Sequence, residues 1–110
     1  MGLNMTTIEI LRKTRDLLVN KDSWTQRAVA RNLLGISVSS TSTNAQSFCL
    51  IGAFSKITGV QHQGTALWNI AKTLGFKNTH ELVIWNDDSR RTYADVISRL
   101  NECIANLESN

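Results

Sequence analysis

The 110-residue sequence contains no proline, only two cysteines and only a small excess of charge. The absence of proline is typical of a mostly helical chain and argues against a loop-rich β fold. The net charge of +3 permits contact with nucleic acid without predicting it. No apolar run is long enough to span a bilayer, and the first ten residues lack the features of a signal peptide. We therefore expect one helical domain over residues 1–110, cytoplasmic and with no membrane contact.

The most apolar stretch covers residues 43–58, TNAQSFCLIGAFSKIT, which carries no charge between Phe48 and Phe54. Thr43 and Gln46 have the spacing of a capping box, and Gly59 is placed to end a helix in the left-handed conformation. This pattern predicts a buried central helix over residues 43–58. Within it, Gly52 and Ala53 leave room for another backbone to approach closely.

Capping signals and apolar periodicity predict four further helices. These helices begin near Thr7, cover residues 23–34 and 65–74, and begin again at Thr92. Between the second and central helices, six of the seven residues from Ser37 to Thr43 are serine or threonine, which favours a connector with a short extended piece. Residues 81–85, ELVIW, fit either a strand or an extended approach to a turn at 86–89, and we favour the second. The predicted fold class is all-α, a compact bundle of about five helices with a minor β pair from residues 36–38 and 82–84.

Catalysis by a cysteine would need an exposed thiol with a lowered pKa and a nearby base. Cys49 is the candidate nucleophile, His62 or His80 the candidate base, and Asn86 or Asp87 the orienting group. Because Cys49 falls in the middle of the predicted central helix, we interpret it as a buried structural thiol. Cys103 also lies on an apolar helix face, so two free thiols are expected rather than a disulfide. We predict no enzyme activity.

A metal site is not predicted. His62, His80, Cys49 and Cys103 include no local ligand pair with the spacing of a zinc motif. The sequence also has no glycine-rich phosphate loop between Gly35 and Gly52. We therefore expect no metal and no cofactor.

Nucleic-acid binding is an open alternative that rests on arginines. The candidate residues are Arg12, Arg15, Arg27, Arg31, Arg90 and Arg91. Arg27 and Arg31 would share one face of the predicted second helix. However, the connector after that helix is too long for a helix-turn-helix motif, so this function is not favoured.

The W-N-D segment formed by Trp85, Asn86 and Asp87 has two interpretations. As structure, the indole anchors a turn while the two polar side chains bond the local backbone and cap the next helix. As function, the indole and carboxylate floor a small polar pocket that is completed by Trp24 and Gln26. We favour structure.

Three segments resemble a known family. They are WTQ at 24–26, CLIGA at 49–53 and WNDDSRRTYADV at 85–96. They are similar to the W-x-Q, C-x-x-G-A and W-N-D elements of a family of short bacterial and phage proteins classed as a domain of unknown function. The resemblance extends from about Leu11 to Leu107 and supports the fold and the choice of residues. The sequence departs from the family in its Ser/Thr-rich connector and in residues 59–81.

Trp68 falls outside the apolar stripe of its predicted helix, and an exposed tryptophan often marks a partner surface. The leading hypothesis is therefore a small non-enzymatic interaction protein that binds another protein through the Trp68 face, with a homodimer left open. The binding residues that we predict are Trp24, Gln26, Trp68, Trp85, Asn86 and Asp87. The resemblance to phage proteins also suits an inhibitor of a host factor.

Overall fold

Five α-helices and a small sheet make up residues 5–60 and 65–109, the part of the chain that the computed structural model describes. The elements in chain order are α1 (Thr7–Leu17), the 3-10 helix η2 (Lys21–Ser23), β1 (Ala30–Arg31), β2 (Ser37–Val38), β3 (Ser47–Phe48), α2 (Leu50–Thr58), α3 (Thr65–Thr73), α4 (Thr79–Asp87) and α5 (Tyr93–Glu108). The three strands are antiparallel in the order β2-β1-β3. The chain is therefore mostly helical, but the predicted all-α class is correct only in part.

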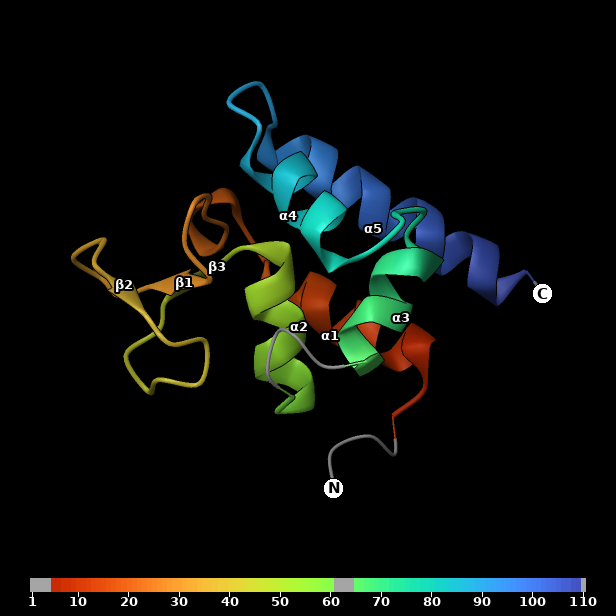
Figure 1. Cartoon of the computed structure of the whole chain (residues 1–110), viewed down its shortest axis with the longest axis horizontal. Coiled ribbons are helices and arrows are strands. Elements are labelled where there is room, and N and C mark those ends of the chain that lie inside the picture. Colours follow the sequence, from red (N-terminus) through yellow and green to blue (C-terminus); the bar gives the residue numbers. More distant parts are fainter. Residues whose placement is uncertain (1–4, 61–64, 110) are drawn as a thin grey trace.

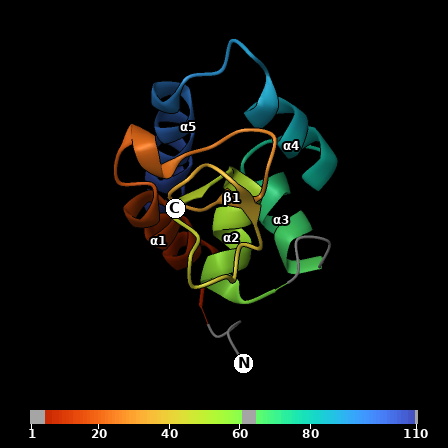
Figure 2. The same ribbon diagram turned by 90° about the vertical axis from the view of Figure 1, so that its left-hand side faces the viewer.

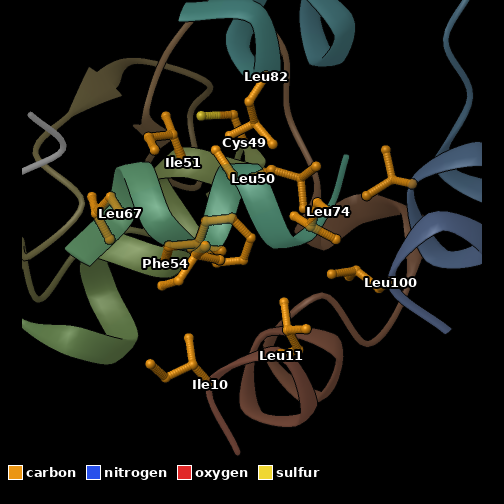
Figure 3. Packing of buried hydrophobic residues seen from close by; sticks show 14 of the residues in the cluster. Ile10, Leu11, Cys49, Leu50, Ile51, Phe54, Leu67, Leu74, Leu82 and Leu100 are labelled. Carbon is orange, nitrogen blue, oxygen red and sulfur yellow. The ribbon is translucent and has the colours of Figure 1, made fainter. Parts of the chain in front are cut away.

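Helix α2 lies in the middle of the molecule, with α1 on one side and α3 on the other (Figure 2). It also contacts α4, whereas α5 packs along α1 (Figure 1). The side chain of Phe54 is fully buried and lies between side chains of α1 and α3 (Figure 3). Gly59 ends α2 in the left-handed conformation, with φ of 74°. The predicted central helix and its end are confirmed.

The start of that helix was predicted wrongly. Thr43 and Gln46 form no capping box, because the backbone N–H of Gln46 donates to the carbonyl of Arg31 and the next two residues form strand β3. The helix begins only at Leu50, and Cys49 is its N-cap, with the Sγ atom accepting a hydrogen bond from the N–H of Gly52 at 3.3 Å. The N–H of Gln46 is therefore used in pairing with strand β1 and is not available to the side chain of Thr43 for the predicted cap.

Gly52 lies where the backbone of another segment crosses α2. A Cβ atom added at this position would lie 1.9 Å from the carbonyl oxygen of Val29. The same oxygen accepts a hydrogen bond from the N–H of Cys49 at 3.2 Å, which holds the two backbones together. The predicted close approach at Gly52 is confirmed.

The second helix, expected over residues 23–34, is absent from the described structure. Residues 21–23 form only η2, and the chain then runs irregularly into the β1–β2 hairpin. Gly35 has φ of 80°, yet it closes the hairpin turn rather than a helix, because its N–H donates to the carbonyl of Asn32. Trp24 therefore lies outside any helix, where it forms an isolated bridge with Phe48.

The segment ELVIW, residues 81–85, was also predicted wrongly, because it lies within helix α4 rather than in an extended segment. Asn78 caps this helix by accepting a hydrogen bond from the N–H of Glu81. Asn86 and Asp87 are the last residues of the helix and not a turn. The predicted pairing of residues 36–38 with residues 82–84 was therefore wrong, since β2 pairs with β1.

The remaining helices agree with their predictions. The predicted capping box of Thr6 with Glu9 is formed. The last helix begins after Thr92 with Asp95 in its first turn, as predicted, and these two residues form a second capping box. The buried residues of α3 and α5 include Leu67, Ile70, Ala71, Val96, Leu100, Cys103 and Ile104, as the periodicity predicted. No helix within residues 5–60 and 65–109 has the length and apolarity needed to cross a bilayer.

Candidate functional site

Asn86 joins three segments that are far apart in the sequence. Its side chain is only 1% exposed, at the end of α4. Its Oδ1 atom accepts hydrogen bonds from the indole Nε1 of Trp24 at 2.8 Å and from the backbone N–H of Leu50 at 3.1 Å. Its Nδ2 atom donates to the carbonyl of Thr25 at 3.2 Å and to Oδ1 of Asp87 at 2.9 Å. The amide thus uses both acceptor and both donor positions.

Gln26 and Asp87 extend this network. The Nε2 atom of Gln26 donates to the carbonyls of Asn86 at 2.9 Å and Asp88 at 2.8 Å, so it covers carbonyls at the end of α4. The Oδ1 atom of Asp87 also accepts from the backbone N–H of Arg27 at 2.9 Å. Arg27 has φ of 64°, a left-handed conformation that is uncommon for a residue other than glycine.

The structure therefore unites four of the predicted binding residues, Trp24, Gln26, Asn86 and Asp87. All four direct polar atoms at one another or at the backbone, and these hydrogen bonds connect residues 24–27 to the start of α2 and to the end of α4. The amide of Asn86 is buried with all its polar positions paired, and a satisfied buried polar group of this kind fixes one arrangement of the chain. Asn86 thus has a structural role that differs from the predicted one, because it lies in α4 and bonds Trp24, Thr25 and Leu50 instead of forming a turn and capping the next helix.

A surface hollow of about 460 Å³ opens beside this junction. It is lined by Arg27, Val29, Cys49, Ile51, Val83 and Asp87, among others. Its wall is largely aliphatic, with one carboxylate and one guanidinium. This is the combination of an apolar surface with a few polar groups that small-molecule sites show.

Cys49 lies at a helix N-terminus, contrary to its expected mid-helix position. A helix N-terminus normally favours a thiolate. Here burial raises the pKa of the Cys49 thiol to about 11, and the nearby carboxylate of Asp87 adds to that rise, while the N–H of Gly52 opposes it. The thiol is therefore protonated at neutral pH and serves as a cap. It forms no hydrogen bond with His80 in the described structure, and His62 lies outside the described residues.

Trp85 lies away from the junction, on another face of α4. Its ring packs against Phe76, with the centroids 5.6 Å apart. The guanidinium carbon atoms of Arg91 and Arg99 lie 4.0 Å and 4.9 Å from its centroid. Trp85 lines a separate hollow of about 380 Å³ and does not share a pocket with Trp24.

Trp68 is 44% exposed, as its place in the pattern predicted. Its indole Nε1 donates to the carbonyl of Lys77 at 3.1 Å, and the ammonium of Lys72 lies 5.0 Å from the ring centroid. The polar atom and one face of the ring thus have partners within the chain. A role in partner binding stays a prediction.

Most of the candidate nucleic-acid-binding arginines make contacts within the molecule. Arg12 pairs with Glu108 and Arg90 with Asp88, while Arg15 donates to Asn101. The guanidinium of Arg31 donates to Thr25 Oγ1 and to the carbonyls of Gln26 and Gly35, and Arg91 donates to the carbonyl of Trp85. Arg27 and Arg31 do not share a helix face, because no helix forms there.

Sequence reasoning missed the tip of the β1–β2 hairpin, where Leu33, Leu34 and Ile36 are exposed. These residues had been assigned to a helix and to the start of a connector. A signal was present, because Asn at the first and Gly at the fourth position of NLLG favour a type I turn. The left-handed Arg27 had no comparable signal.

The described residues contain no group of three or more histidine, cysteine, aspartate or glutamate side chains that is placed to hold a metal ion. Comparison with known proteins matches residues 3–106 to the model of one family, DUF6197, described as a family of unknown function. The match covers nearly the whole chain, so the chain belongs to this family. Neither a curated protein nor a solved structure matches the chain.

Proposed function

We propose that this member of a family of unknown function is a non-enzymatic interaction protein that binds a partner protein through the tip of the β1–β2 hairpin. The observation that supports the proposal is the exposure of three large apolar side chains on one short loop. Leu33, Leu34 and Ile36 are 86%, 81% and 57% exposed. Single exposed apolar residues are ordinary, whereas a contiguous group marks an interaction surface.

The hairpin tip, defined as residues 32–36, is braced from within. The Oδ1 atom of Asn32 accepts from the N–H groups of Leu34 and Ile36, both at 3.0 Å. The N–H of Asn32 donates to the carbonyl of Ile36, and Arg31 donates to that of Gly35. A loop held in this way loses little freedom on binding, which favours affinity.

The hairpin projects from the body of the molecule (Figure 1). A projecting apolar tip suits insertion into an apolar groove of a partner. Two tips packed together would bury well under the roughly 1,200 to 2,000 Å² of a stable interface, so a second copy is a poorer fit. Between Asp22 and Glu81 the sequence has no acidic residue, while Arg27, Arg31 and Lys56 are basic. We therefore expect the groove to carry a neutral or acidic rim.

The test compares the capture of partners from native lysate by four proteins. They are the wild-type chain, the Leu33→Ser/Leu34→Ser double variant and the single variants Val19→Ser and Trp68→Ala. Val19→Ser is the matched control, because Val19 is also exposed, at 70%, but lies two residues after the end of α1. Trp68→Ala examines the face that the sequence predicted. We expect a discrete partner that the double variant loses and both single variants keep. Loss with Trp68→Ala but not with the double variant would contradict the proposal.

A further inference from the structure

The hollow beside Asn86 carries an inference that goes beyond the proposed interaction through the hairpin tip. We propose that this hollow binds a small zwitterion with an aliphatic side chain, of the class of leucine and its relatives. Three features support this ligand class: an aliphatic wall, one carboxylate with a free oxygen, and one guanidinium with free donors.

The aliphatic wall comes from three segments of the chain. Val29 lies in the segment that crosses α2, Ile51 is in the first turn of α2, and Val83 is in α4. The hollow has a volume of about 460 Å³, which is at the small end of the range for ligand sites. A branched aliphatic chain of a few carbons would contact all three residues.

The carboxylate belongs to Asp87. Its Oδ1 atom accepts hydrogen bonds from the N–H of Arg27 and from Nδ2 of Asn86, which fix the carboxylate at the wall of the hollow. Its Oδ2 atom makes no hydrogen bond with the described residues. That oxygen is available to an ammonium group.

The guanidinium belongs to Arg27. It forms neither an ion pair nor a hydrogen bond with the described residues, in contrast to Arg31 nearby. Its planar donors match a carboxylate. The left-handed backbone of Arg27 brings its N–H onto Asp87, and both residues line the hollow. Strained backbone of this kind is concentrated at ligand sites.

Among the residues that line the hollow, Arg27 and Asp87 are the two that carry charge, so the formal charges cancel. A simple amine would leave the guanidinium without a partner, and a simple carboxylate would leave Asp87 without one. A zwitterion with ammonium and carboxylate on neighbouring atoms satisfies both groups at once. The thiol of Cys49, which is protonated, also lines the hollow and adds a polarizable contact.

The experiment titrates ¹⁵N-labelled full chain with L-leucine and follows the backbone amide signals. We expect saturable shifts at Arg27, Ile51 and Val83. Glycine, 3-methylbutylamine and 4-methylpentanoate each lack one feature of leucine, and each should bind about tenfold more weakly or worse. No saturable shift with leucine, or equal binding of the amine alone, would overturn the assignment.

Two variants separate binding from folding. Arg27→Gly removes the guanidinium but suits the left-handed backbone, so it should fold at least as well as the wild type and bind leucine about tenfold more weakly. Asp87→Asn keeps an acceptor oxygen and removes the charge, with the same expected loss. Asp88→Asn is the control, because that carboxylate lies outside the hollow and pairs with Arg90. Unchanged affinity in Arg27→Gly would overturn the proposal, whereas the Leu33→Ser/Leu34→Ser variant should bind leucine normally.

Discussion

Replacement of Asn86 by alanine should destabilise the fold more than its size suggests. The change leaves the indole N–H of Trp24 and the backbone N–H of Leu50 without their acceptor, in a site that is 1% exposed. Each buried donor without a partner costs about 1 to 3 kcal/mol, so the free energy of unfolding should fall by about 3 to 5 kcal/mol. For a domain of this size that corresponds to a fall in Tm of roughly 12 to 20 °C.

Urea unfolding followed by circular dichroism measures this loss directly. Asn101→Ala is the matched control, because Asn101 is exposed on α5 and accepts one hydrogen bond from Arg15. The control should change stability by no more than about 0.5 kcal/mol. If Asn86→Ala and Asn101→Ala lost equal stability, Asn86 would not be the residue that joins the three segments.

For an Asn86→Asp variant, the same urea unfolding experiment should give a loss of stability that depends on pH. The introduced carboxyl keeps the acceptor but places its second oxygen against the carbonyl of Thr25 and the carboxylate of Asp87. Burial and the nearby negative charge raise the pKa of such a carboxyl in the folded state. Its neutral form is therefore favoured by folding, and stability relative to wild type should be greatest below a pH of about 4 and fall as the pH rises. Equal differences from wild type at pH 4 and pH 7 would refute this reasoning.

Other predictions concern the backbone crossing and the thiol beside it. Gly52→Ala should lower the free energy of unfolding by about 1 to 3 kcal/mol, because the added Cβ would lie 1.9 Å from the carbonyl oxygen of Val29. This clash outweighs the higher helix propensity of alanine. A variant as stable as the wild type in thermal unfolding would contradict the close approach of the two backbones at Gly52. Since the pKa of Cys49 is raised to about 11 from an ordinary value near 9.0, its contribution to stability is fully present below pH 9 and is lost as the pH rises through 11. Urea titrations at pH 9 and pH 11 measure how far the free energy of unfolding falls between the two pH values. This fall should be smaller for a Cys49→Ser variant than for the wild type, and an equal fall would contradict the burial of the thiol.

The sequence predicted best those elements whose signals are local. The capping box at Thr6 and the stop at Gly59 involve residues within four positions of each other, and both are formed. The predicted start of the last helix after Thr92, with Asp95 in its first turn, is also confirmed. The pattern at Thr43 and Gln46 is equally good on local grounds. It fails because the N–H of Gln46 has a partner in Arg31, fifteen residues earlier, that periodicity does not reveal.

The candidate site was predicted as a set of residues but not as an arrangement. The predicted group was Trp24, Gln26, Trp85, Asn86 and Asp87, and the structure unites all of these residues except Trp85. The burial of Asn86 could not be predicted, because asparagine and aspartate at 86–88 favour a turn as strongly as a helix end. The signal NLLG was ambiguous in the same way, since a left-handed glycine ends helices and closes hairpins alike.

The central functional claim is that the hairpin tip contacts a partner protein, and site-specific photocrosslinking tests it most directly. A benzoylphenylalanine in place of Leu33 would be irradiated in native lysate, with the same group in place of Val19 as the control. The account predicts one discrete heterologous crosslink from position 33 and none from position 19. A crosslink of twice the mass of the chain would identify a second copy instead, and equal labelling from both positions would contradict the claim.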